Sequence, residues 1–243
     1  MDKDYAQYLL KKTIQDYNLI AEEFSRTREY VPEDRKNLIL RYIRPGSRVL
    51  DLGCGNGRFS DIFREDIDYI GVDNSEKMIE IAEKEHPGKK FQAASALNLP
   101  FSDNSFDVIF SFAVIHHIPS KELRLLFLKE AERILKSGGI LILTAWYLNP
   151  IRMALIGEWG RVAELMKYQI LKIFGLSKLD FGDFFVSWKN IVPRYIHCFS
   201  VNGLKKLVKK SGFKIKEAGI LSGRKTKERN TYLVVQKIDK KEN

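Results

Sequence analysis

The sequence predicts an α/β fold with a doubly wound, mostly parallel, seven-stranded sheet, from three observations. Apolar runs alternate with helix-forming runs between residues 47 and 146, which is typical of a parallel sheet covered on both faces. A glycine-rich turn, "DLGCGNG", follows the first apolar run. The last two apolar runs, at 214–221 and 231–238, have no helix between them and predict an antiparallel hairpin that ends the sheet.

The other elements follow from local patterns in chain order. Residues 1–24 have apolar side chains at helical spacing, and a second helix begins near Glu33 and ends before Pro45. Alternation then predicts strands at 47–53, 68–73, 89–94, 106–114 and 139–146, and helices at 57–65, 75–86, 120–136 and 200–213. Ser75 is the expected N-cap of its helix, and Gly138-Gly139 should close the helix before them.

The length of 243 residues and the hydrophobic fraction of 44% suit one large domain with an insertion. Regular patterns lapse between about 149 and 193, apart from a helical run within "RVAELMKYQILKIF". We therefore expect an N-terminal helical cap at 1–45, a cofactor-binding core at 46–148, a lid-like insertion at 149–193, and a C-terminal helix and hairpin with a basic tail at 194–243. Two cysteines form no disulfide framework, which favours the cytoplasm. The sequence contains no apolar run long enough to predict a membrane span.

The positive charge is concentrated near the C-terminus. The net charge is +10, and residues 190–243 hold 14 Lys and Arg against 4 Asp and Glu, so 14 − 4 = +10 accounts for the whole excess. This asymmetry indicates a polyanionic partner. The alternative is a solvated lysine face on the helix that carries Lys205, Lys206, Lys209 and Lys210.

The glycine turn predicts a ligand site. Ligands bind beyond the carboxyl ends of the strands of such sheets, and alternate glycines let the backbone turn sharply and approach a ligand. Asp51 precedes the first glycine, where a carboxylate suits a cationic group. Asp73 ends the next strand and suits the two hydroxyls of a ribose. The alternative is a tight turn with Asp51 as a helix cap.

The ordered set "VLDLGCGNGRF", "YIGVDNS", "LNLPFSDNSFDVIFSFAVIHHI" and "RILKSGGILIL" resembles the class I S-adenosylmethionine-dependent methyltransferases, which have a Rossmann-like fold. The resemblance implies S-adenosylmethionine as cofactor, with Asp51 and the glycine turn on its methionine part, Asp73 on the ribose and Asn74 beside the adenine. Ser95 stands where many relatives have an acidic residue, so its hydroxyl and the Ala96 backbone should hold the adenine. The implied cofactor residues are Asp51, Gly53, Cys54, Gly55, Asp73, Asn74, Ser95, Ala96 and Phe112.

Segments outside this core resemble the eukaryotic tRNA wobble-uridine methyltransferases, which esterify 5-carboxymethyluridine. They are "YNLIAEEFSRTR", "AVIHHI", "GDFFVSW" and "PRYIHCFSVNGLKKLVKKSGF", although Ile196 replaces the second tyrosine of the family motif. The resemblance implies the tRNA anticodon loop as partner, with the wobble position as target. It also raises a small zinc-binding activator protein as a possible partner.

A carboxylate acceptor is already ionised near pH 7, so positioning by cations should matter more than a strong base. Arg28 and Arg194 are the expected cations, because a guanidinium binds a carboxylate bidentately, and either His116 or His117 should contact the carboxylate or the uracil edge. The expected catalytic residues are Arg28, His116, Arg194 and His197, and the expected substrate-binding residues are Tyr17, His117, Trp188 and Tyr195. Several of these have plainer alternatives: Arg28 could pair with a neighbouring acid, and Trp188 and Tyr195 could be ordinary core. The spacing of His and Cys residues predicts no metal site.

Two other functions stay open from the sequence. A methyltransferase of the same fold could act on a small carboxylic acid or on a lipid or quinone precursor. A cofactor-binding regulatory protein without catalysis would need no polar set such as Arg28, His116 and Arg194.

Overall fold

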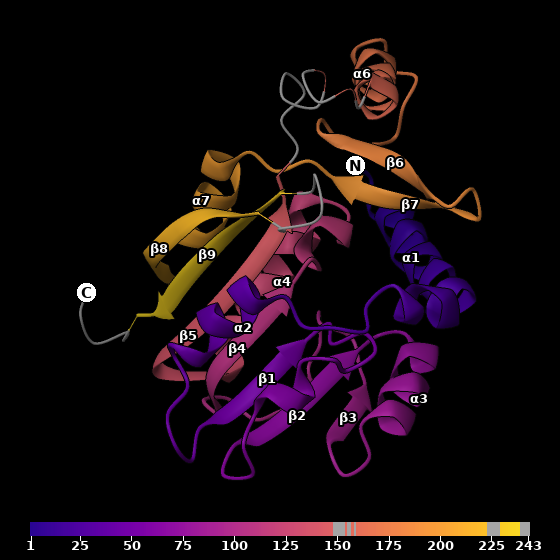
Figure 1. The fold of residues 1–243 in the computed structure, drawn as a ribbon. Helices are drawn as coiled ribbons and strands as arrows, with labels where there is room; N and C mark the ends of the chain where they lie inside the picture. The colour runs from indigo at the N-terminus through magenta and orange to yellow at the C-terminus, as the bar shows by residue number, and fades with distance from the viewer. Residues whose placement is uncertain (148–153, 155–156, 158, 223–228, 239–243) are drawn as a thin grey trace.

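The computed structural model describes the chain except residues 148–153, 155–156, 158, 223–228 and 239–243. A seven-stranded sheet with the order β3-β2-β1-β4-β5-β9-β8 forms its centre (Figure 1). The strands β1 to β5 run parallel, whereas β9 is antiparallel to both β5 and β8. Their bounds are β1 Arg48–Leu52, β2 Asp68–Asp73, β3 Lys90–Ala93, β4 Phe106–Phe112, β5 Leu135–Trp146, β8 Phe213–Ser222 and β9 Arg229–Lys237. The predicted fold class is confirmed.

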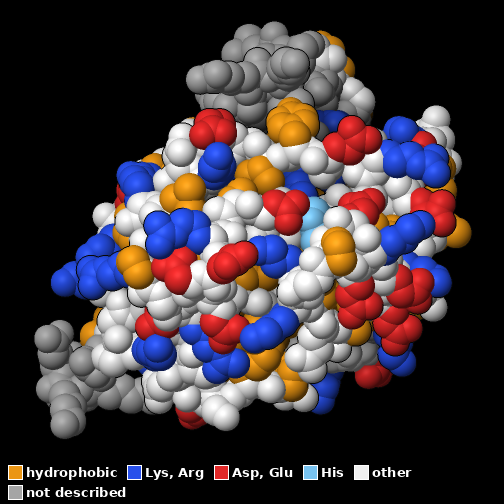
Figure 2. All heavy atoms as spheres, turned by 60° about the horizontal axis from the view of Figure 1, so that its bottom comes forward, with side chains coloured by type: hydrophobic (Ala, Val, Ile, Leu, Met, Phe, Trp, Pro, Cys, Tyr) orange, Lys and Arg blue, Asp and Glu red, His pale blue; other side chains and the backbone are white. Residues whose placement is uncertain are grey.

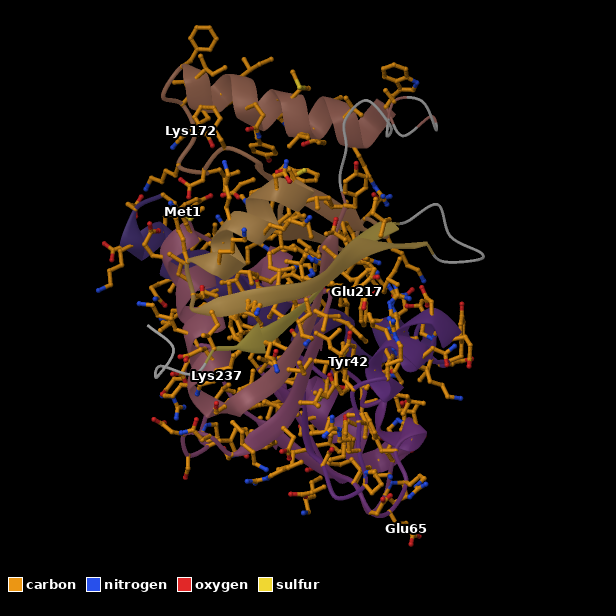
Figure 3. All side chains as sticks on the ribbon, turned by 90° about the vertical axis from the view of Figure 1, so that its left-hand side faces the viewer. Met1, Tyr42, Glu65, Lys172, Glu217 and Lys237 are labelled. Carbon is orange, nitrogen blue, oxygen red and sulfur yellow. The ribbon has the colours of Figure 1, made fainter. Side chains whose placement is uncertain are left out.

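The helices are α1 Lys3–Arg26, α2 Glu33–Leu40, α3 Glu76–Glu85, α4 Lys121–Ile134, α6 Trp159–Ile173 and α7 Val201–Lys209. The predicted N-cap Ser75 is confirmed, because its hydroxyl accepts a hydrogen bond from the Met78 backbone N–H at 3.2 Å. Apolar side chains of α4 and α7 bury one face of the sheet, and those of α2 and the segment after β1 bury the other. Tyr42 and Glu217 lie close together (Figure 3), where the tyrosine hydroxyl donates to the carboxylate at 3.1 Å and ties the end of the α2 region to β8.

Three predicted helices are wrong or too long. The helix predicted at 200–213 ends at Lys209, and Phe213 begins β8. The segment 57–65 forms only a short 3-10 turn, Ser60–Ile62, because the chain becomes extended at Phe63. The Phe63 ring then stacks on Tyr69 with the ring centroids 5.2 Å apart. The helix predicted at 120–136 ends at Ile134, and Gly138-Gly139 belong to β5. Leu135 pairs with Phe106 of β4, so sheet pairing overrides the helical propensity there.

The sequence did not predict strands β6 (Asp183–Trp188) and β7 (Val192–His197), which form an antiparallel hairpin. The hairpin crosses the boundary expected at residue 193. It lies between α6 and α1 in Figure 1, and Leu165 of α6 packs against its inner side chains Phe184, Val186 and Ile196. None of the described helices is long and apolar enough to cross a membrane.

Candidate functional site

A cavity of about 480 Å³ lies at the carboxyl ends of β1, β2, β4 and β5, with α1 over it. The strand order reverses between β1 and β4, the switch point at which doubly wound sheets bind ligands. The turns after the strands supply most of the lining, at 51–56, 73–74, 94–97, 112–114 and 116–118. Side chains of α1 line the opposite wall.

The glycine turn gives the cavity a bare backbone floor. Gly53 has φ +84°, and a Cβ added there would lie 2.2 Å from Val114 Cγ2, so no larger residue fits. Gly55 has φ +56°, but a Cβ built on it has no neighbour within 4 Å. Because Gly55 lines the cavity, this open space is available to a ligand.

One buried carboxyl group, of Asp51, and one partly buried carboxyl group, of Asp73, flank this floor. Asp51 is 2% exposed and accepts a hydrogen bond from the Tyr69 hydroxyl at 3.1 Å. Burial raises the pKa of Asp51 to about 8, and the nearby Asp73 carboxylate adds to the shift. Asp73 accepts from the backbone N–H groups of Gly55 and Ser75, each at 2.9 Å. A cationic ligand group would convert Asp51 to its ionised form and pair with it.

Polar contacts hold α1 against the turns of the sheet. The Ser75 hydroxyl donates to Asn18 Oδ1 at 2.6 Å, and Asn56 Nδ2 donates to Ser25 Oγ at 2.9 Å. Of the described lining residues, none comes from 149–193. The helix α1 therefore forms the cover, and the lid function of the insertion stays a prediction.

Arg28 and Arg58 bring two cations to the end of the cavity near Asp51. The Arg28 guanidinium stacks over Phe24 at 4.8 Å and donates to the Thr27 carbonyl at 3.0 Å. No acidic side chain in the described ranges lies within 4 Å of it, so pairing with a neighbouring acid does not occur. Burial lowers the pKa of Arg58 to about 10, and the positive charge of Arg28 contributes.

His116 is a buried hydrogen-bond donor without a partner. Its Nδ1 faces the backbone N–H of Trp146 at 3.3 Å. Because that N–H can only donate, Nδ1 accepts and the proton of the neutral ring is on Nε2. Burial holds the pKa of His116 well below its usual range, and the electrostatic interactions with the His117 ring and the Arg194 cation act in the same direction. Nε2 has no partner among the described residues.

Arg194 is the second such donor. Its side chain is 7% exposed, its guanidinium lies 5.7 Å from the Trp146 ring, and Nη1 donates to the Tyr17 hydroxyl at 3.3 Å. Nε is buried and has no partner in the described part of the chain, and no carboxylate there lies within 4 Å. Since His116 also packs on Trp146, with ring centroids 5.3 Å apart, both unpaired donors lie at the same wall of the cavity.

The structure brings most of the predicted residues together and leaves three aside. The cavity is lined by Tyr17, Arg28, Asp51, Gly53, Cys54, Gly55, Asp73, Asn74, Ser95, Ala96, Phe112, His116, His117 and Arg194. Among described contacts, His197 pairs instead with the buried Asp183 at 2.6 Å, Tyr195 packs with Leu9 and Leu179, and Trp188 packs with Ile20 and Val192. These three side chains do not line the cavity. For Trp188 and Tyr195 this agrees with the alternative that they are ordinary core residues.

Two of the lining residues that sequence reasoning missed bear on the chemistry of the site. Arg58 directly follows the third glycine, and Trp146 ends a strand next to β4. The rule that ligands sit beyond the carboxyl ends of parallel strands could have found Trp146. Among the described residues, no three His, Cys, Asp or Glu side chains gather in a way that would hold a metal ion.

Comparison with known proteins identifies relatives for most of the chain. Residues 50–143 match the methyltransferase domain family. A protein of Encephalitozoon cuniculi that is named as a methyltransferase is 31% identical over 225 residues, or 91% of this chain and 93% of the relative. The mouse tRNA (carboxymethyluridine(34)-5-O)-methyltransferase ALKBH8 is 38% identical over 57% of this chain. The match covers only 20% of that longer protein.

Solved structures share the fold at lower identity. A SAM-dependent methyltransferase of Methanosarcina mazei has a TM-score of 0.69 and 24% identity, covering 83% of this chain and 97% of its own. A methyltransferase solved in complex with the Trm112 methyltransferase activator of Haloferax volcanii has a TM-score of 0.62 and 16% identity, covering 92% and 96%.

Proposed function

Because the chain belongs to the class I S-adenosylmethionine-dependent methyltransferases, we propose that it methylates a carboxylate, namely that of 5-carboxymethyluridine at position 34 of tRNA. The observation that supports a carboxylate as the methyl acceptor is the pair of buried, unpaired donors, His116 Nε2 and Arg194 Nε. The choice of tRNA as the substrate rests on the relatives and on a basic surface.

The cavity fits the cofactor. Asp51 would pair with the ammonium of its methionine part, and Asp73 would accept from the ribose hydroxyls. Arg28, which the sequence pattern predicts at the acceptor, is assigned here to the cofactor. Together with Arg58, at the same end as Asp51, it would bind the cofactor carboxylate, since a guanidinium matches a carboxylate bidentately. The open space over Gly55 leaves room for the ligand. When bound, S-adenosylmethionine supplies a methyl group on an electrophilic sulfonium.

The acceptor wall has the chemistry of a carboxylate site. A buried guanidinium without an anion and a buried N–H without an acceptor each cost stability. A carboxylate satisfies both at once, because its oxygens accept two N–H bonds. We therefore assign Arg194 and His116 to the acceptor, where they fix the oxygen that attacks the methyl group.

No strong general base is needed in this scheme. The acceptor carboxylate is ionised near pH 7, and both histidines are neutral, with the pKa of His117 lowered to about 3 by burial and by Arg194. Catalysis then comes from orientation of the nucleophile. The Trp146 ring lines the same wall, and the guanidinium groups of Arg161 and Arg194 lie over it at 5.8 and 5.7 Å from its centroid.

The lysines of α7 and of its C-terminal cap support a polyanionic acceptor. Lys206, Lys209 and Lys210 are exposed, and none of them lies within 4 Å of a carboxylate in the described ranges. On the face shown in Figure 2, by contrast, acidic and basic side chains are intermixed. Cations without partners suit phosphates. A small carboxylic acid would use the same two donors but would not need these lysines.

The test offers the pure protein radiolabelled S-adenosylmethionine and bulk tRNA from cells that lack wobble esterification. Label that enters tRNA and is released by mild alkali would support the proposal, since a methyl ester is alkali-labile. Arg194→Ala should abolish that label while leaving cofactor binding intact. Alkali-stable label in tRNA, or label only in a small acid, would overturn it.

We also infer a small activator protein as a partner, because a solved structure of the same fold is such a complex. The transfer assay is therefore run with and without a zinc-binding activator of that kind. Label that depends on the activator supports this inference, and equal label in both reactions contradicts it.

A further inference from the structure

We infer that Tyr17 and His117 do not recognise the acceptor themselves but position the Arg194 guanidinium through a hydrogen-bond chain of fixed direction. The inference rests on the proposed function, since it concerns how the cation that binds the acceptor carboxylate is oriented. Its basis is the set of contacts that connect α1, the turn after β4, and β7.

The direction of the chain follows from its last member. His117 Nδ1 lies 3.0 Å from the backbone carbonyl of Tyr195. A carbonyl can only accept, so Nδ1 carries the proton of the neutral ring. Nε2 is then the acceptor, and the Tyr17 hydroxyl at 2.9 Å must donate to it.

The remaining contact completes a closed ring. Because Tyr17 uses its proton toward His117, its oxygen is free to accept from Arg194 Nη1 at 3.3 Å. Burial raises the pKa of Tyr17, so the hydroxyl keeps that proton. The chain leads from the Arg194 side chain through Tyr17 and His117 to the backbone of the next residue, Tyr195. Each hydrogen bond of the chain therefore has one fixed direction.

This ring uses one of the five N–H donors of Arg194 and leaves the others, among them the buried Nε–H, to a ligand. Nη1 is used by Tyr17 and the guanidinium plane is held near the Trp146 ring, 5.7 Å from its centroid. Nε stays unpaired. Without the tyrosine hydroxyl, the guanidinium could rotate about its side-chain bonds, and an acceptor would meet it in several orientations.

Tyr17 also connects the two halves of the site. Its neighbour Asn18 accepts from Ser75, whose backbone N–H donates to Asp73. Of these adjacent residues of α1, Asn18 is thus linked through Ser75 to Asp73, and Tyr17 contacts Arg194 directly. The position of α1 over the cofactor half of the cavity is linked in this way to the orientation of the Arg194 guanidinium.

The first test is a double-mutant cycle with Tyr17→Phe and Arg194→Lys, measured as methyl transfer to tRNA that carries carboxymethyluridine. Tyr17→Phe keeps the ring packed on Phe24, 5.4 Å away, and removes only the hydroxyl. We expect kcat/KM for tRNA to fall about 10- to 100-fold, with cofactor affinity unchanged. In the Arg194→Lys background the same change should cost about threefold or less. An equal loss in both backgrounds would overturn the inference, because Tyr17 would then act independently of Arg194.

Two substitutions of His117 sharpen the test. Asn places its amide at the position of Nδ1 and cannot reach Tyr17, whereas the Gln side chain can place its oxygen near Nε2 and accept from Tyr17. Gln should therefore retain more activity than Asn, and the reverse order would contradict the inference. Tyr8→Phe, an exposed tyrosine on the same helix, is the matched control.

A second readout does not depend on any acceptor. In protein labelled with ¹⁵N-arginine, the Nε–H resonance of Arg194 is identified by its loss in Arg194→Lys. Tyr17→Phe and His117→Asn should shift or broaden it, while Tyr8→Phe should not. If the resonance is unchanged in both variants, the positioning chain is wrong even if the enzyme methylates tRNA. If it responds but tRNA is not methylated, the chain stands and the proposed acceptor fails.

Discussion

Cofactor affinity should depend on pH through Asp51. With the pKa of Asp51 at about 8 in the free protein, about 1% of the carboxyl groups are ionised at pH 6 and about 9% at pH 7. Only the ionised form pairs with the cofactor ammonium, and the apparent Kd equals the intrinsic Kd divided by the competent fraction. The Kd for S-adenosylmethionine should therefore fall about ninefold from pH 6 to pH 7.

The assay is isothermal titration at both pH values, in buffers of different ionisation enthalpy. Binding at pH 7 should release close to one proton, and Asp51→Asn should remove both the proton release and the pH dependence while weakening binding. A wild-type Kd that is equal at pH 6 and pH 7, with no proton release, would refute the reasoning.

The same group makes an opposite prediction for stability. The pKa of Asp51 is higher in the folded chain than in the unfolded chain, so the folded state holds an extra proton between about pH 4 and pH 8. Unfolded chains bind fewer protons in this window, and wild-type stability falls as pH rises through it. Asp51→Asn removes that loss, so at pH 7.5 the variant should unfold at a higher temperature than wild type although it binds cofactor more weakly.

Three further predictions concern single features of the site and the surface. Arg194→Lys keeps the charge but loses the planar fork, so kcat should fall about 100-fold in steady-state assays while the Kd for cofactor is unchanged; equal kcat would remove Arg194 from the acceptor site. Gly55→Ala should weaken cofactor binding in titrations by at least tenfold, because the new Cβ enters the cavity. Gly46→Ala is its control, since Gly46 also has positive φ and open space around it but lies outside the lining; equal weakening in both would point to backbone strain alone. Replacing three exposed lysines of α7 and its C-terminal cap by Gln should reduce the slope of log K for tRNA against log salt by about 2 to 3; these are Lys206, Lys209 and Lys210. Replacing three lysines on the α3 side should leave the slope unchanged; these are Lys77, Lys84 and Lys90.

The parts of the site that sequence alone predicted are those formed by short segments. The glycine turn and Asp73 follow their strands directly, so the strand pattern is enough to place them at one edge of the sheet. Ser75 caps the next helix for an equally local reason. Such features depend on neighbours in the chain rather than on distant packing.

The acceptor wall could not be predicted in the same way. Arg194 reaches His116 because β7 pairs with β6 and lies against α1, and the hairpin has no clear periodic signal in the sequence. The segment around it contains Trp188, Tyr195 and His197, whose side chains suit a core or a site equally well. Only the packing shows that His197 faces Asp183, whereas the Arg194 side chain faces the cavity.

The neutral histidines make a last prediction about the chemical step. If methyl transfer needs only an ionised carboxylate held by Arg194 and His116, no group involved in the step titrates between pH 6 and pH 8. The pKa of His117 is lowered to about 3, that of His116 is also far below its usual range, and a bound cation keeps Asp51 ionised. Single-turnover rates at saturating cofactor should therefore stay constant within about twofold over this range, while kcat/KM for cofactor rises about ninefold from pH 6 to pH 7. A histidine acting as general base would instead make the single-turnover rate fall about tenfold per pH unit below its pKa. That result would mean that one of the two rings carries its proton differently from the hydrogen bonds at Trp146 and Tyr195.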